Sequence, residues 1–282
     1  MAEELETLAH GFGLIEGPRV DEHDNLYFSD VPNGGVRRRD PSGEITVVIP
    51  KRRGVGGIAI HADGGLVVSG RNICHVKDGE TRVLFDPGAP GFNDLMTDAD
   101  GRIYCGTIRS DPFDESGPRT PGEAYLIDLD GSVTELYGDV SLTNGIGFSP
   151  DGRTMYHSDS GRGHVICHDV ETGDDGAIRV VNRRAIAHGT GLQPDGLAVD
   201  SEGVIWVADF GKGAVIGLSP EGETVGRIDV PSTMATSLCF GGGDLRDLYI
   251  VTANNTEDEA RAGTIFRTRV DVPGLRAPEA RV

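Results

Sequence analysis

Short apolar segments alternate with turns rich in aspartate and glycine along the whole chain. Six times the sequence repeats an apolar stretch, an Asp/Gly-rich turn and a second apolar or aromatic stretch. The six repeats read IEGPRVDEHDNLYFSD, GGIAIHADGGLVVSG, NDLMTDADGRIYCGT, NGIGFSPDGRTMYHSD, DGLAVDSEGVIWVAD and SLCFGGGDLRDLYIVTA. Most repeats add a third strand and a second turn. Asp-Gly and Asn-Gly turns between β-rich segments are typical of hairpins, because these turns require residues that tolerate positive φ.

The repeats predict an all-β fold, a six-bladed β-propeller that occupies residues 1–282 as one domain. Successive turn residues lie 37 to 51 positions apart, and no helical periodicity interrupts them. These turn residues are Asp24, Asp63, Asp100, Asp151, Glu202 and Asp244. A β-sandwich is the alternative, but six repeats in phase are hard to fit into two packed sheets. We expect the leading segment LETLAHG to join the last blade as its outer strand and so close the ring.

One position in each repeat falls at the start of the first strand, which lines the central channel of a propeller. The six residues there are Glu16, Gly56, Asn93, Asn144, Asp195 and Ser237. Four of them are carboxylates or carboxamides, and three of these four are spaced 51 residues apart. Because equivalent positions of the blades lie at one height, we expect these side chains to form a ring around the axis.

Two carboxylates and two carboxamide oxygens that converge on one point suit a hard cation such as calcium. Without a cation the two carboxylates would repel each other in an enclosed channel. Any single Asn-Gly or Asp-Gly pair is more simply a strand-entry turn, but four residues in phase predict a metal site. Calcium is favoured, and zinc, manganese, magnesium and ferrous iron are alternatives, although no histidine or thiolate shares this phase.

Composition argues against two classes of partner. The chain has 45 acidic and 26 basic residues, a net charge of −19, which argues against nucleic acid or an anionic membrane as partner. No apolar run approaches the roughly 20 residues that span a bilayer, and the N-terminus does not resemble a signal peptide. Four scattered cysteines without a CxxC pair predict reduced thiols in a cytoplasmic protein. The oligomeric state is not determined by these features.

With these motifs the chain resembles the family of senescence marker protein, gluconolactonase and luciferin-regenerating enzyme, whose members are six-bladed propellers. The resemblance runs from IEGP through FSDVPNGGVRR, FND, TNGIGFSPDG, YHSDS and QPDGLAVDSEGVIWVAD to the last blade. It implies that Glu16, Asn144 and Asp195 are metal ligands. Asn93 would be a fourth ligand, or would act through a bound water and the substrate. Asp195 would be the general base, and Asn93 and Asn144 would orient the substrate.

The resemblance therefore predicts metal-dependent hydrolysis of a small lactone, with Asp195 and Asn93 as catalytic residues. Two positions differ from the sugar lactonases of the family. Gly91 stands where those members carry an arginine before FND, and Glu123 is displaced from the glutamate that their third-blade loop supplies. Aryl ester or organophosphate hydrolysis, an isomerase, lyase or condensation step on the same metal, and non-catalytic calcium binding are the alternatives.

Two further expectations concern the rest of the chain. Residues 109–122 lengthen the third repeat and are expected to form a surface loop or a lid over the site. His61 and His157 fall beside or within predicted strands, and we assign them no part in the chemistry. No Gly-x-Ser-x-Gly elbow is present, which argues against a covalent mechanism.

Overall fold

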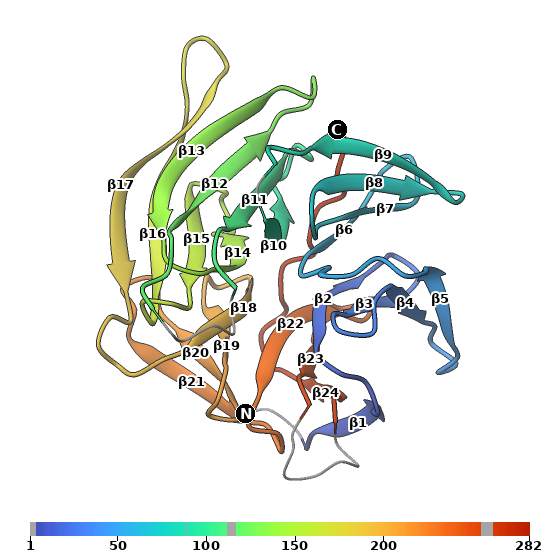
Figure 1. The fold of residues 1–282 in the computed structure, drawn as a ribbon. Helices are drawn as coiled ribbons and strands as arrows, with labels where there is room; N and C mark the ends of the chain where they lie inside the picture. The colour runs from blue at the N-terminus through green and yellow to red at the C-terminus, as the bar shows by residue number, and fades with distance from the viewer. Residues whose placement is uncertain (1–3, 89, 112–116, 255–261) are drawn as a thin grey trace.

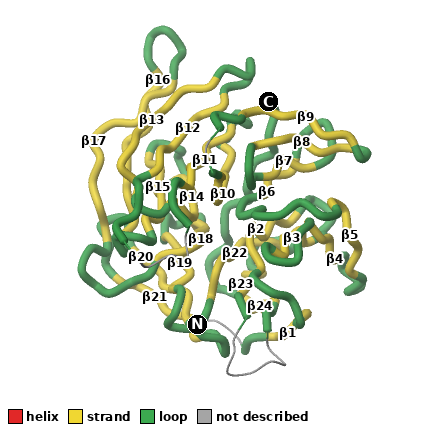
Figure 2. Tube along the Cα trace, viewed as in Figure 1, coloured by secondary structure: helices red, strands yellow, loops and turns green. Residues whose placement is uncertain are grey.

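The computed structural model describes residues 4–88, 90–111, 117–254 and 262–282. In this part of the chain, 24 strands form six four-stranded antiparallel sheets that radiate from a central channel (Figure 1). Figure 2 shows strands and loops alone, and no helix that could cross a membrane occurs in the described residues. The all-β propeller that the repeats predict is confirmed.

Each sheet is one blade, numbered here from the first complete sheet of the chain. Blade 1 contains β2 (Ile15–Val20), β3 (Leu26–Asp30), β4 (Val36–Arg39) and β5 (Ile45–Ile49). Blade 2 contains β6 (Ile58–Ile60), β7 (Leu66–Val68), β8 (Ile73–Lys77) and β9 (Glu80–Phe85). Blade 3 contains β10 (Gly91–Thr97), β11 (Ile103–Ile108), β12 (Gly122–Ile127) and β13 (Val133–Val140).

The remaining three sheets follow the same plan. Blade 4 contains β14 (Thr143–Phe148), β15 (Thr154–Asp159), β16 (His164–Thr172) and β17 (Ile178–Ile186). Blade 5 contains β18 (Pro194–Val199), β19 (Ile205–Asp209), β20 (Ala214–Leu218) and β21 (Thr224–Asp229). Blade 6 contains β22 (Ala235–Gly241), β23 (Asp247–Thr252), β24 (Ile265–Arg269) and β1 (Glu6–Ala9).

The N-terminal strand closes the ring, as the sequence predicts. β1 pairs antiparallel with β24, with Thr7 opposite Phe266 and Glu6 opposite Arg267. The carboxylate of Glu6 also accepts a charged hydrogen bond from the guanidinium of Arg267 (2.6 Å). Blade 6 is thus built from both ends of the chain, which leaves none of the six sheets short of a strand.

An aspartate that precedes the first turn of a blade stabilises this turn through hydrogen bonds. The carboxylate of Asp98 accepts hydrogen bonds from the main-chain nitrogens of Gly101 and Arg102, both at 3.0 Å. Asp21 and Asp200 do the same for the corresponding turns of blades 1 and 5. These Asx turns satisfy donors that the hairpin itself leaves free, which explains why aspartate recurs at this place in the repeats.

The hydrophobic core is divided into six clusters, one between each pair of neighbouring blades. Between blades 3 and 4, for example, Tyr104 and Leu126 pack against Ile146 and Met155. The inner strands are buried on both faces, and β2 is buried at every position. The outermost strands have exposed positions, as at Val47 of β5. Each blade is therefore stabilised mainly by its neighbours, which holds the six first strands in a fixed ring.

A C-terminal strap, residues 271–282, crosses one end of the channel and is drawn in red in Figure 1. Its main chain bonds to blade 5 through Leu275 and Val199 (3.0 Å) and to blade 2 through Ala280 and Ile60 (2.8 Å). Further hydrogen bonds join it to blades 1, 3 and 6. The sequence pattern does not predict this strap.

The segment predicted as an insertion, residues 109–122, is described only in part. Residues 112–116 lie outside the described residues, and Gly122 already begins β12. The expectation of a surface loop or lid there stays a prediction.

Candidate active site

The first strands of the blades contact one another around the channel in the order β2, β6, β10, β14, β18 and β22, and β22 returns to β2. Glu16, Asn144 and Asp195 lie on three of these strands, and each exposes only 7% of its surface. Asn93 of β10 is half-buried, and Ser237 of β22 is buried. The strands thus bring the four predicted side chains to the inside of the ring.

Glu16 and Asp195 form a pair of buried carboxylates that repel each other. Burial raises the pKa of Glu16 well above its ordinary value, and the negative charges of Asp195 and Asp94 raise it further. Burial and Asp94 likewise raise the pKa of Asp195, although a hydrogen bond with Asn144 opposes the rise. The Oδ1 atom of Asp195 is buried without a hydrogen-bond partner. An unpaired oxygen in such surroundings is costly, so this site carries an unsatisfied demand for positive charge or a donor.

The carboxamide of Asn144 is held by the turn between β15 and β16. Its Nδ2 donates to the hydroxyl of Ser160 (3.2 Å), and that hydroxyl donates to the main-chain oxygen of Pro194 (2.5 Å). Pro194 directly precedes Asp195. The hydroxyl of Ser160 therefore links two of the predicted ligands, which come from different blades.

The carboxamide of Asn93 extends from the strand of one neighbouring blade to that of the other. Its Nδ2 donates to the main-chain oxygen of Thr143 (2.9 Å), next to Asn144. Its Oδ1 lies over Gly56, where a Cβ atom would approach that oxygen to 2.1 Å. Only glycine fits at position 56 without displacing the side chain. In both asparagines the nitrogen donates to other groups of the protein, to Thr143 in one case and to Ser160 and Asp195 in the other, and this assigns the remaining atom as the carbonyl oxygen.

A hydrogen-bonded chain behind the ring was missed by sequence reasoning. The hydroxyl of Thr143 bonds to Nε2 of His157 (2.6 Å), and Nδ1 of His157 bonds to the hydroxyl of Tyr137 (2.7 Å). His157 is fully buried, and burial lowers its pKa to about 3, so the ring is neutral. No spacing signal relates these three residues, because they meet only through strand pairing and the contact between blades 3 and 4.

A buried ion pair beside the ring was also missed. Arg19 and Asp94 lie 3.6 Å apart, and each side chain is only 5% exposed. A signal was present in the sequence, because Asp94 follows Asn93 at a phase where four other repeats carry glycine. Those glycines are Gly17, Gly57, Gly145 and Gly196. A single carboxylate among glycines in a buried ring marks a position that differs from its equivalents.

The two positions that differ from the sugar lactonases are both described. Gly91 begins β10 opposite Ile108, so no side chain extends from it. The carboxylate of Glu123 accepts hydrogen bonds from the hydroxyl of Thr107 (2.6 Å) and from Nε of Arg109 (3.0 Å). These partners within blade 3 account for Glu123 without a ligand.

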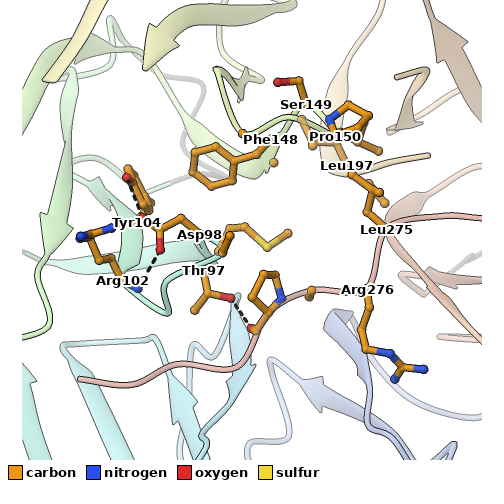
Figure 3. A pocket seen from close by; sticks show the side chains of 18 of the residues that line it. Thr97, Asp98, Arg102, Tyr104, Phe148, Ser149, Pro150, Leu197, Leu275 and Arg276 are labelled. Carbon is orange, nitrogen blue, oxygen red and sulfur yellow. Dashed lines mark hydrogen bonds and ion pairs between the residues drawn. The ribbon is translucent and has the colours of Figure 1, made fainter. Parts of the chain in front are cut away.

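The opposite end of the channel has a different character. A cavity of about 460 Å³ lies there between the far ends of the first strands and the C-terminal strap. Figure 3 shows Phe148 and Leu197 across from Thr97, with Leu275 and Arg276 of the strap beside them. None of the four predicted ligands lines this cavity. The buried carboxylates and this largely apolar space therefore belong to opposite mouths of one channel.

The fold and the candidate site together define a class of protein, the six-bladed propellers that carry carboxylates and carboxamides on the first strands of their blades. The model of the SMP-30/gluconolactonase/LRE-like region matches residues 14–254, and the chain belongs to this family. The match covers every strand that carries a predicted ligand.

Curated relatives agree with this assignment over nearly the whole chain. A 6-deoxy-6-sulfogluconolactonase of Pseudomonas putida is 35% identical over 90% of this chain and 89% of that protein. The pentonolactonase XacC of Haloferax volcanii is 34% identical over 95% of this chain and 94% of its own length. Regucalcin of Xenopus laevis is 30% identical, with 97% and 96% covered.

Among solved structures, a luciferin-regenerating enzyme superposes with a TM-score of 0.89 at 25% identity and covers 99% of both chains. A regucalcin from Agrobacterium tumefaciens, a calcium-binding protein, superposes with a TM-score of 0.84 at 24% identity, which shows the shared fold. It covers 98% of this chain and 97% of that chain.

Proposed function

We propose that this protein is a metal-dependent lactonase whose site is the ring of Glu16, Asn93, Asn144 and Asp195. One observation carries the proposal above the others. Two buried carboxylates repel each other, Oδ1 of Asp195 has no hydrogen-bond partner, and the nitrogens of both carboxamides are held by hydrogen bonds. Lactonases among the relatives support hydrolysis of a cyclic ester as the reaction.

The side chains present fit a hard divalent cation. In the described residues no three His, Cys, Asp or Glu side chains form a metal-binding group by themselves, so the carboxamide oxygens would have to complete the set. Glu16 and Asp195 would supply charge, and Asn93 and Asn144 would supply neutral oxygens, the donor types that calcium accepts. Without histidine or thiolate in the ring, calcium suits the donors better than zinc or ferrous iron. The relation to regucalcin supports a divalent ion of this kind.

A bound cation would supply electrostatic stabilisation of the negative charge that develops on the ester oxygen, an effect of several kcal/mol in such sites. The residues of the chain do the rest. The hydrogen bonds of their nitrogens hold the carboxamides of Asn93 and Asn144 in one orientation. The burial of Glu16 and Asp195 strengthens every charge interaction made there.

In the proposed reaction Asp195 moves the proton. Its unpaired Oδ1 accepts a proton from the attacking water as the water oxygen bonds to the carbonyl carbon. The ring C–O bond then breaks, and the departing oxygen takes the proton, which gives a hydroxy acid. Burial makes Asp195 a stronger base than a solvated aspartate, because it raises the pKa of the carboxyl. Ligation to a cation would lower the pKa of Asp195 again, so its strength as a base would depend on how closely it approaches the ion.

The substrate class follows from the relatives together with the rim of the site. Lactones of sugar acids are the substrates that two relatives' names give, and we propose the same class here. Gly91 leaves the start of β10 without a side chain, so the hydroxyls of the substrate would be bound by other groups or by water.

The test is a panel of aldonolactones, aliphatic lactones and aryl esters, assayed after chelation and after return of calcium, manganese, magnesium or zinc. We expect turnover of lactones that disappears with chelator and returns with one of these ions. Asp195→Asn should lose turnover, and Asp229→Asn on the exposed edge of blade 5 serves as the matched control. Full activity in the chelated protein would refute the role of the cation. Turnover of aryl esters alone would refute a lactone as the substrate.

A further inference from the structure

The buried charges beside the ring consist of more than the two candidate ligand carboxylates. Asp94 raises the pKa of both Glu16 and Asp195, and Arg19 lowers that of Glu16. Three carboxylates and one guanidinium therefore act on one another, and Arg19 lies between the ring and the cavity under the strap, which it also lines. When all three carboxylates are ionised, as a bound cation would require, three negative charges and one positive charge leave a net charge of −2.

The position of Arg19 is fixed by the main chain on two sides. One terminal nitrogen donates to the oxygen of Pro18 in its own strand (2.7 Å), and the other donates to the oxygen of Leu95 in β10 (2.9 Å). The second nitrogen also lies 3.6 Å from Oδ1 of Asp94, which itself accepts from the nitrogen of Leu95 (2.8 Å). The guanidinium thus bridges blades 1 and 3, and these hydrogen bonds hold it in one position.

The carboxylate of Asp94 is equally confined. It exposes 4% of its surface and stands where the neighbouring blades carry glycine. Arg19 provides the ion pair that makes this burial tolerable, because an unpaired buried charge is strongly unfavourable. The pair is therefore a fixed part of the channel wall, and its net charge is zero.

We propose that Arg19 cancels the charge of the buried Asp94, so that an ion in the ring meets only the −2 of Glu16 and Asp195. The inference rests on the proposed cation site. A divalent ion brings this total to zero, whereas loss of Arg19 alone leaves −3 and loss of Asp94 alone leaves −1. In surroundings of low dielectric constant, the affinity for an ion follows the charge that it neutralises.

The experiment measures calcium and terbium binding to chelator-stripped protein by titration calorimetry. Arg19→Met should raise the preference for Tb³⁺ over Ca²⁺ by on the order of tenfold or more, because one extra unit charge acts on one extra unit of ionic charge. Asp94→Asn should lower the same ratio by a similar factor. The double variant Arg19→Met/Asp94→Asn returns the net charge to −2 and should return the ratio close to that of the parent protein.

Matched controls separate this role from general effects of charge and folding. Arg269→Met and Asp244→Asn remove the two members of an exposed ion pair in blade 6, so they change the protein's net charge equally but away from the channel. Arg19→Lys keeps the positive charge and should keep the ratio even where it lowers thermal stability. A purely structural role of Arg19 would make the losses accumulate in the double variant.

The outcomes distinguish this inference from the proposed function. If the parent protein binds neither ion, the cation site itself is wrong and the proposal falls with it. If it binds calcium and the Tb³⁺/Ca²⁺ ratio does not follow net charge across the four variants, this inference alone is overturned. A ratio restored in the double variant supports it.

Discussion

The carboxamide nitrogen of Asn93 donates a hydrogen bond to the main-chain oxygen of Thr143, the residue immediately before Asn144. The orientation of one candidate ligand on β10 therefore depends on the placement of the next one on β14. Thr143 in turn is held through its hydroxyl by the buried ring of His157. This connection gives the first of five predictions.

Thr143→Val removes the hydroxyl while it keeps the shape of the side chain. We expect the free energy of unfolding to fall by about 1–3 kcal/mol, because Nε2 of His157 is left buried without a partner. Urea denaturation measures the change, and Thr81→Val on the exposed face of β9 is the control. Equal stability of the two variants would show that the bond between Thr143 and His157 contributes nothing.

The neutral state of His157 makes the fold sensitive to acid. Its pKa in the folded protein is about 3, below its ordinary value of 6.5, so the unfolded chain binds a proton that the folded chain does not. The contribution of His157 to the unfolding free energy is therefore fully present above pH ~6.5 and decreases as the pH drops towards 3. His157→Gln should make the dependence of unfolding free energy on pH shallower in this range. His168, whose pKa is lowered to about 4, maintains part of the slope.

Glu16→Gln should stabilise the protein when no cation is bound. The pKa of Glu16 is raised, so above its ordinary value of 4.5 the unfolded chain loses its proton first, and stability falls as pH rises. At pH 7 the neutral amide removes this penalty, and we expect a gain of about 0.5–2 kcal/mol. Thermal melts in chelator test it, with the exposed Glu22→Gln as control. In calcium the order should reverse, and a variant that is less stable in both conditions contradicts the assignment.

Ser160→Ala removes the hydrogen bond that the nitrogen of Asn144 donates to the serine hydroxyl, and it leaves all four candidate ligands unchanged. Loss of a hydrogen bond that orients a metal ligand typically costs 10–100-fold in affinity, and we expect about this loss in calcium binding and in kcat/KM. Calorimetry and lactone turnover provide the two readouts. Ser201→Ala, an exposed serine in the first turn of blade 5, should change neither. Unchanged calcium affinity in the Ser160 variant would contradict this positioning role.

Gly274→Ala tests the C-terminal strap. A Cβ atom at this position would lie 1.8 Å from the ring of Phe240, so the strap or the ring has to move. We expect a loss of about 1–3 kcal/mol in unfolding free energy, as for an overpacked core. Gly243→Ala in the same blade meets nothing within 4 Å and should be neutral. Equal melting temperatures would mean that the strap does not contribute to stability.

The periodicity of the sequence was sufficient to predict the architecture. The spacing of turns such as those at Asp100 and Asp151 sets the length of each blade, and a strand pattern with buried faces requires neighbours on both sides. The closure by β1 followed from the missing strand of blade 6, because an open sheet edge has to be covered. The ring of candidate ligands followed from phase alone, since equivalent positions of the blades are related by the axis.

The surroundings of the ring were beyond the reach of periodicity. Arg19 and Asp94 come from different blades, and their pairing depends on where a long side chain extends across the channel. The contact between Thr143 and His157 depends on the pairing of β14 with β15. The strap has no repeat to identify it, because its main chain pairs with the blade turns through isolated bridges. Such contacts depend on three-dimensional packing and leave little trace in spacing.

The closure of blade 6 by β1 affects when the candidate site forms during folding. Glu16 lies near the beginning of the chain and Asp195 in the fifth blade, and the strand between them in the ring, β22, belongs to the blade that needs both ends of the chain. Contacts so distant in sequence form late, because a long loop has to be closed before they are made. A chain still under synthesis therefore holds no assembled ring. Binding of a cation would mark the moment at which the last strand has docked.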